Sequence, residues 1–160
     1  MKKHKQTLEY NQYETPEALP ETDRRYIALA RQAARQAYAP YSGFQVGAVA
    51  VLADGSAYTG NNQENAAYPS GQCAERVALF YANAQKPDVA VLTLYIVAEK
   101  QGELINEPVT PCGSCRQVIL ESSLRFGQAI RLVLAGQQAI YEIPEATQML
   151  PLSFQREFLA

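Results

Sequence analysis

The sequence has little of what several classes of protein require. Only three of its 160 residues are cysteine and one is histidine. An odd number of cysteines in a reducing compartment is more typical of metal ligands or nucleophiles than of disulfide halves. The longest apolar run, residues 89–98, is interrupted by Thr93 and falls short of the roughly 18 residues that a membrane helix needs. No membrane segment is therefore expected.

An excess of charge of one sign is also missing. Fourteen basic residues are scattered against 16 acidic ones, for a formal net charge of -2, and they form no basic stripe that could neutralise a phosphate backbone. Nucleic acid is therefore a weak candidate for a partner. Lys2, Lys3 and Lys5 are followed by polar residues and not by the apolar stretch of a secretory signal, so we expect a cytoplasmic protein.

What is present is typical of one globular domain. Hydrophobic residues make up 48% of the chain and charged residues 19%, which is enough apolar surface for a core. Residues 1–22 contain Pro16, Pro20, several charges and no apolar periodicity, and they predict a loosely ordered N-terminal arm. Residues 23–160 are expected to form a single domain.

Helical and strand patterns alternate along this domain. A helix is predicted from Thr22 or Asp23 to about Tyr38, ended by Pro40. The further predictions are a hairpin of strands 45–52 and 57–60, a helix over 73–84, a central strand over 89–97, a helix from Pro111 to Glu121, strands 130–134 and 139–143, and a short helix over 144–150. This alternation predicts an α/β fold with a mixed sheet between helices.

All three cysteines lie at predicted helix starts. Cys112 and Cys115 are three residues apart, so their sulfurs share one helical face, and Cys73 joins them if the two helix ends meet. The unpaired N–H groups and positive dipole end of a helix stabilise thiolate. Zinc suits such a soft set of ligands.

The number of ligands separates a structural from a catalytic zinc site. Structural sites have four protein ligands, whereas catalytic sites have three and leave one position to water. The only histidine, His4, lies in the N-terminal arm, where a solvated side chain is the simpler interpretation. A bare Cys-x-x-Cys also suits a zinc knuckle or a redox pair, but Glu75, two residues after Cys73, favours catalysis because a carboxylate beside activated water can move its proton.

Two arginines follow the cysteines closely. Three thiolates around a doubly positive ion leave a net negative cluster, which weakens the ability of the metal to acidify water. Hydrogen bonds from Arg76 and Arg116 to sulfur would draw off part of this charge. The alternative is that both are surface residues.

Four stretches of the sequence resemble the homotetrameric cytidine deaminases. They are Tyr38-Ala39-Pro40-Tyr41-Ser42-Gly43-Phe44-Gln45-Val46-Gly47-Ala48, Asn62-Gln63-Glu64-Asn65-Ala66-Ala67-Tyr68, Cys73-Ala74-Glu75-Arg76 and Pro111-Cys112-Gly113-Ser114-Cys115-Arg116-Gln117. The likeness runs from about residue 24 to the C-terminus. It implies a three-layer α-β-α sandwich with a five-stranded mixed sheet, and one Zn²⁺ per chain held by the three cysteines.

The resemblance also implies a reaction, the hydrolytic deamination of cytidine and deoxycytidine in pyrimidine salvage, with release of ammonia. In this family zinc activates the attacking water and a non-ligand glutamate, here Glu75, carries the protons. Asn62 and Glu64 are then expected to bind the ribose 3′-hydroxyl and Phe44 to pack on the pyrimidine.

Further positions follow from the same likeness. The backbone N–H groups of Ala74 and Glu75 and the carbonyl of Thr110 are expected at the edge of the base. Tyr68 and Phe154 resemble residues that reach the site of a neighbouring subunit, which predicts a homotetramer, although core or interface packing would also explain them.

Each substrate contact has a plainer alternative. Asn62 and Glu64 could order a turn, and Phe44 could belong to the core. Gln63 and Asn61 depart from the family pattern, which has an apolar residue and a cysteine there.

Three other functions stay open. Deaminases of nucleoside-like antibiotics share the zinc core but lack a sugar-binding pair such as Asn62 and Glu64. Deaminases of nucleotides or of bases in nucleic acids usually have histidine as the first ligand, where this chain has Cys73. A non-catalytic zinc-stabilised binding module predicts a closed four-ligand site and no turnover.

Overall fold

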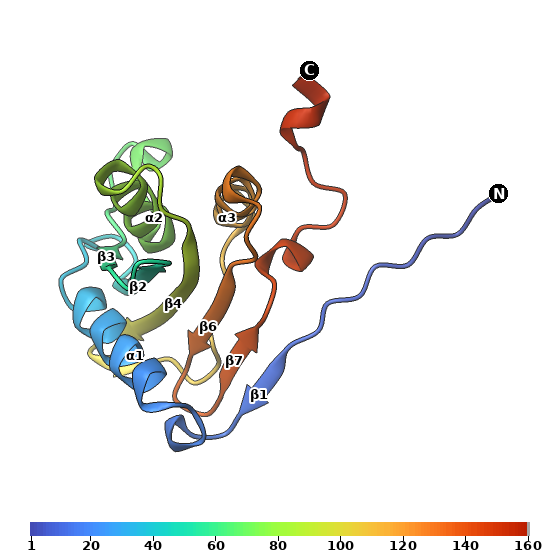
Figure 1. The fold of residues 1–160 in the computed structure, drawn as a ribbon. Coiled ribbons are helices and arrows are strands. Elements are labelled where there is room, and N and C mark those ends of the chain that lie inside the picture. The colour runs from blue at the N-terminus through green and yellow to red at the C-terminus, as the bar shows by residue number, and fades with distance from the viewer. Residues whose placement is uncertain (160) are drawn as a thin grey trace.

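A mixed β-sheet with helices on both faces forms the molecule (Figure 1). The computed structural model describes residues 1–159. Its strands are β1 (Asn11–Tyr13), β2 (Phe44–Leu52), β3 (Ala57–Asn61), β4 (Val91–Lys100), β5 (Glu103–Leu104), β6 (Arg131–Ala135) and β7 (Ile140–Ile143). Its helices are α1 (Glu21–Ala34), α2 (Ala74–Gln85) and α3 (Gly113–Phe126), with the 3-10 turns η1 (Pro16–Ala18), η2 (Tyr68–Ser70), η3 (Ala146–Met149) and η4 (Arg156–Leu159).

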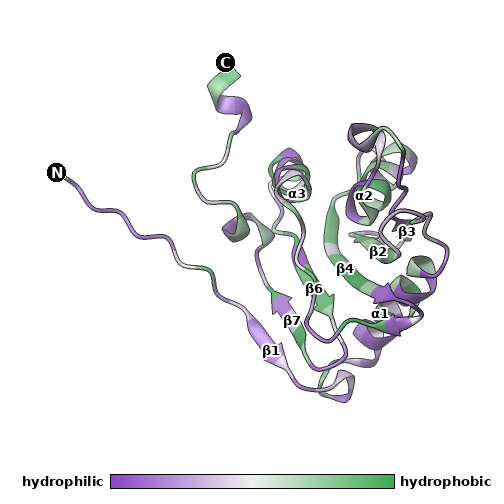
Figure 2. Cartoon of the chain, turned by 180° about the vertical axis from the view of Figure 1, so that it is seen from behind, coloured by the Kyte–Doolittle hydropathy of each residue, from purple (hydrophilic) through white to green (hydrophobic). Residues whose placement is uncertain are grey.

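The strand order is β1-β7-β6-β4-β2-β3, with β5 paired to β4. Strands β4 and β6 are parallel and the other pairs are antiparallel. Figure 2 shows β4 and β6 as mainly hydrophobic, as expected for central strands covered on both faces. No helix among residues 1–159 has the length and apolar character needed to cross a membrane.

Two hydrophobic clusters give the molecule its layers. On one face of the sheet, α1 packs through Tyr26 and Ala30 onto Val49 and Tyr95. On the other face, α2 and α3 pack onto alternate residues of the same strands, among them Leu94. The predicted three-layer α/β sandwich is therefore confirmed.

The predicted number of five strands was wrong, because the sheet has seven. Strands β1 and β5 were missed since they are three and two residues long and lack an apolar alternation. β1 pairs with β7 and is also held by Asn11 and Tyr13, whose side chains donate to Glu142 over 3.1 and 2.6 Å. The division into an arm, 1–22, and a domain, 23–160, stays a prediction.

Two predicted helices differ from the observed ones. Helix α1 ends at Ala34 and not near Tyr38, because the N–H groups of the next residues turn back to Ala33 and Ala34 and the Asn61 amide donates to the Ala33 carbonyl. The segment predicted as a helix over 144–150 contains the single 3-10 turn η3.

Two glycines let the helices approach the sheet closely. A Cβ at Gly47 would lie 2.0 Å from the carbonyl oxygen of Ala30 in α1, and a Cβ at Gly60 would lie 2.4 Å from the backbone nitrogen of Ala78 in α2. No side chain fits such gaps. Gly60 therefore sets how closely α2, whose first turn follows Cys73, lies against β3.

An ion network ties α1 to the neighbouring strands β6 and β7. Arg131 donates to both oxygens of Asp23, over 3.0 and 2.6 Å, and to Glu142. Tyr95 also donates to Asp23, which is buried. Burial alone would raise the pKa of Asp23, but the hydrogen bonds from Arg131 and Tyr95 outweigh it and hold this pKa below its usual value.

Candidate metal centre

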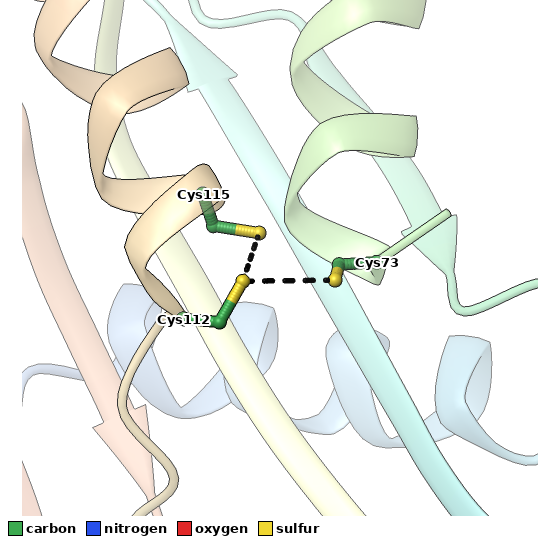
Figure 3. Close-up of side chains that lie close together, drawn as sticks. All are labelled: Cys73, Cys112 and Cys115. Carbon is green, nitrogen blue, oxygen red and sulfur yellow. Dashed lines mark hydrogen bonds between the residues drawn. The ribbon is translucent and has the colours of Figure 1, made fainter. Parts of the chain in front are cut away.

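The three cysteines converge from the start of two helices. Cys73 is the residue before α2, Cys112 is the residue before α3, and Cys115 lies in the first turn of α3. Cys73 and Cys112 have extended backbone angles, and the residue after each of them is the first residue of a helix. Figure 3 shows the three side chains pointing toward a common point between the two helices.

The sulfur spacing fits a tetrahedral metal. The Sγ atoms of Cys73 and Cys112 are 4.0 Å apart, those of Cys112 and Cys115 are 3.6 Å apart, and all three lie within 4.8 Å of one another. Zinc–sulfur bonds of about 2.3 Å in a tetrahedron place sulfurs about 3.8 Å apart. Within residues 1–159 no fourth His, Cys, Asp or Glu side chain joins this group, so the chain supplies three ligands.

Electrostatics favour thiolate at Cys73, the residue before α2. The pKa of Cys73 is lowered to about 5. A hydrogen bond with Cys115 is the main cause, and a hydrogen bond with Cys112 and the charge of Arg76 add to it. The same hydrogen bond and burial raise the pKa of Cys115. A divalent cation bound between the three sulfurs would favour their ionisation.

Glu75 lies beside the sulfur cluster in the first turn of α2. Its side chain is only 6% exposed, and burial is the main cause that raises its pKa. A raised pKa brings a carboxyl group closer to the range in which it can both accept and return a proton. The structure therefore places Glu75 beside the sulfurs, and its role as proton carrier stays a prediction.

A cleft of about 400 Å³ opens onto the cluster. Cys73, Cys112 and Glu75 line it, while Cys115 is fully buried. The five residues predicted to contact substrate also line this cleft: Phe44, Asn62, Glu64, Ala74 and Thr110. The structure thus gathers the predicted ligands, the predicted proton carrier and the predicted substrate contacts at one site.

The two predicted ribose contacts are held differently. The Asn62 side chain is tied to β2, because its oxygen accepts from Val46 N over 2.7 Å and its amide donates to the Phe44 carbonyl over 2.9 Å. Glu64 instead accepts from the loop before β2, through Tyr41 N and both the backbone and the hydroxyl of Ser42. Both line the cleft and keep unused hydrogen-bonding capacity.

The two arginines also differ. Arg76 lines the cleft, its charge lowers the pKa of Cys73, and its buried Nε has no hydrogen-bond partner among the described residues. Arg116 donates to oxygens: Pro111 O over 2.8 Å, Met149 O over 3.1 Å and Thr110 Oγ1 over 3.4 Å. The hydrogen bond from Arg116 to sulfur stays a prediction. The observed hydrogen bonds connect the loop before α3 with the segment around Met149.

The two residues predicted to reach a neighbouring subunit are exposed. Tyr68 is 78% exposed, lines the cleft and meets Tyr41 edge-on with ring centroids 6.3 Å apart. Phe154 is 58% exposed, stacks on Phe158 and does not line the cleft of its own chain. Neither belongs to the core.

Sequence reasoning missed some residues of the cleft. Ser42, Val46, Asn65 and Val109 also line it. Ser42, Val46 and Asn65 stand inside stretches that carry the family resemblance, which was the available signal. Val109 had no such signal, because it stands in an irregular loop.

Residues 20–127 match the family model described as the cytidine and deoxycytidylate deaminase zinc-binding region. The chain belongs to the cytidine deaminase family. A cytidine deaminase from Sporosarcina psychrophila is 38% identical over 134 residues, which are 84% of this chain and 92% of that protein.

Solved structures of the cytidine deaminase family are similar as well. The crystal structure of cytidine deaminase from Burkholderia pseudomallei has a TM-score of 0.69 and 37% identity, covering 82% of this chain and 98% of that one. The enzyme from Mycobacterium tuberculosis has a TM-score of 0.65 and 31% identity, covering 82% and 96%. Together with the zinc-binding region of the family, the three-sulfur cluster fits one Zn²⁺ per chain.

Proposed function

We propose that the protein hydrolytically deaminates cytidine and deoxycytidine to uridine and deoxyuridine, releasing ammonia. The observation that supports this most directly is the convergence of three sulfur ligands and buried Glu75 at one cleft, with no fourth ligand among the described residues. Structures of family members named as cytidine deaminases share the fold. A closed zinc-binding module would need a fourth ligand.

In this proposal each residue has one task. Cys73, Cys112 and Cys115 hold zinc, which when bound supplies a Lewis acid for the activation of water. Glu75 accepts a proton from the attacking water and delivers it to the ring nitrogen, and it then accepts the proton of the added hydroxyl and delivers it to the leaving amine. Its burial keeps the carboxyl away from bulk water, so that protons pass between it and the substrate.

The cleft residues would orient the nucleoside. Glu64 and Asn62 offer an acceptor and an amide to the ribose 3′-hydroxyl, and Phe44 packs on the pyrimidine. The N–H groups of Ala74 and Glu75, at the positive end of α2, and the carbonyl of Thr110 would read the edge of the base. The product loses an amino donor and gains a carbonyl acceptor, so these contacts also distinguish substrate from product.

We also propose a homotetramer in the cytoplasm. Exposed Tyr68 at the mouth of the cleft and exposed Phe154 on the C-terminal segment are apolar surfaces suited to a neighbouring subunit. Three free cysteines that must stay reduced to bind metal suit a reducing compartment.

Turnover of free nucleoside tests the activity directly. Zinc-loaded protein is mixed with cytidine, and ultraviolet absorbance and ammonia are followed together. Equal rates of both signals, abolished by a chelator and restored by zinc, are expected. Zinc-loaded protein without ammonia release would contradict the proposal and favour a binding module.

A further inference from the structure

A serine hydroxyl at the mouth of the cleft links two predicted substrate contacts. We propose that Ser42 is a positioning residue that fixes the Glu64 carboxylate so that one of its oxygens accepts the ribose 3′-hydroxyl. This inference rests on the proposed function and deepens it, because it assigns the discrimination of the sugar to a residue outside the Asn62 and Glu64 pair.

The Ser42 hydroxyl connects Glu64 with Phe44 through two hydrogen bonds. Its hydroxyl donates to Glu64 Oε1 over 2.5 Å and accepts from Phe44 N over 3.0 Å. Gly43, with φ of 63°, provides the left-handed turn that brings Phe44 N back to the serine. One hydroxyl therefore sets the carboxylate that faces the sugar and the start of the strand that carries Phe44.

The Glu64 carboxylate has one hydrogen-bonding position left for a ligand. Glu64 Oε2 accepts two backbone N–H groups, from Tyr41 over 2.8 Å and from Ser42 over 3.3 Å. A carboxylate oxygen accepts about two hydrogen bonds, so Oε2 is filled. Oε1 accepts only the Ser42 hydroxyl among the contacts in residues 1–159 and keeps one site. The free position accepts a donor such as a sugar hydroxyl.

The same contacts keep Glu64 ionised. The Ser42 hydroxyl, followed by the Tyr41 N–H, is the main cause that lowers the pKa of Glu64. A charged acceptor binds a hydroxyl more strongly than a neutral one does and repels a phosphate at the same place. The arrangement thus suits a nucleoside with a free 3′-hydroxyl.

A purely structural role would have a different signature. Ser42 is exposed and lines the cleft, and its hydroxyl does not satisfy any group of the hydrophobic core. Removing it leaves Oε2 bound by two N–H groups but frees Oε1 to rotate. The loss should therefore fall more heavily on substrates that have a 3′-hydroxyl than on those that lack it.

The test compares deoxycytidine with 2′,3′-dideoxycytidine, which lacks this hydroxyl. Ser42→Ala is measured beside wild type, Glu64→Gln and the hydroxyl-retaining control Ser42→Thr, with zinc content and melting temperature recorded for each. For Ser42→Ala we expect KM for deoxycytidine to rise about tenfold, the scale of one hydrogen bond to a charged group. We expect kcat to stay within about twofold, the rise in KM for dideoxycytidine to be clearly smaller than that for deoxycytidine because only the lost contact with Phe44 affects both substrates, and Ser42→Thr to behave as wild type.

Each result decides the inference. A smaller preference for deoxycytidine in both Ser42→Ala and Glu64→Gln, with zinc retained, supports it. Equal losses on both substrates, or no loss, would overturn it while leaving the deaminase activity of the wild type in place. If Ser42→Ala unfolds, Ser42→Thr decides, because a threonine variant that is folded but lacks the preference would contradict a role of the hydroxyl. A wild-type protein without turnover would instead refute the proposed function itself.

Discussion

The molecule contains two polar clusters of opposite character. The ion network of Asp23, Arg131 and Glu142 lies at the β6–β7 side of the sheet, and its charges are paired with one another. The sulfur cluster at the start of α2 and α3 faces a cleft, and its three ligands leave a tetrahedron incomplete. The closed cluster contributes to stability, whereas the open one leaves positions for a metal and a substrate.

The two clusters also differ in the direction in which the pKa of their buried carboxyl group is shifted. Asp23 keeps its pKa low because donors surround it, while burial raises the pKa of Glu75. A carboxylate that is fully paired cannot easily exchange protons, and one that is buried with few donors can. Substitutions in the two clusters should therefore separate activity from stability.

The largest effect is expected from removing one sulfur. Cys112→Ala leaves two ligands, so we expect loss of bound zinc and turnover at background level. Metal content by elemental analysis and ammonia release are the measurements. Ser114→Ala, which changes an exposed residue between Cys112 and Cys115, is the matched control and should keep both the zinc and the turnover. A Cys112→Ala protein with one zinc per chain would contradict the ligand assignment.

The next effect separates metal binding from proton transfer. Glu75→Gln keeps the size of the side chain but cannot carry a proton, so we expect zinc to remain and kcat to fall about 10³- to 10⁴-fold. Rates are measured on protein of verified zinc content. If the glutamine variant stayed fast, another group would have to move the protons.

A change in the closed cluster should affect stability and not chemistry. Asp23→Asn removes one of the two carboxylates that pair with Arg131 and leaves Glu142 as its charged partner, so we expect the free energy of unfolding to fall by about 2 kcal/mol, the scale of a lost hydrogen bond between charged groups. Turnover per folded molecule should stay within about twofold. Urea denaturation measures the first and ammonia release the second. Asp54→Asn, which breaks the exposed pair with Lys86, is the control and should cost much less.

The smallest effect is a dependence on pH. Because the folded-state pKa of Asp23 is lowered, its stabilisation is present above the unfolded pKa of about 3.9 and is lost as the pH falls through the folded value. Wild type should therefore lose stability below about pH 4 more steeply than Asp23→Asn does. Urea titrations from pH 6 down to pH 3 would measure the free energy of unfolding of both proteins. Equal slopes of this free energy against pH would rule out Asp23 as a source of the loss of stability in acid.

Much of the fold could be predicted from local patterns. Strand β4 is an almost continuous apolar run and α2 repeats apolar residues on one face, so both elements are visible in the sequence alone. The short polar strand β1 is not, because its pairing depends on the edge that β7 offers. The pair of Cys112 and Cys115 was predictable since a helix start and a spacing of three residues are local features, whereas the approach of Cys73, 39 residues before Cys112, depends on tertiary structure.

The finer contacts depend on tertiary structure. Asp23 and Arg131 are separated by 108 residues, and nothing in either segment marks them as a pair. The same holds for Ser42 and Glu64, which are 22 residues apart in the chain and meet only in the folded protein. Arg116 was expected beside sulfur, whereas its observed hydrogen bonds go to oxygens that its neighbours in space supply.

The glycine at position 60 has a consequence for any redesign of this protein. A methyl group at this position would collide with the backbone of α2 and push the helix away from β3. Cys73 would move with α2, while Cys112 and Cys115 would stay at the start of α3. Metal affinity in this chain is therefore sensitive to a residue that has no functional group. A search for important positions that considers only reactive side chains would pass over it.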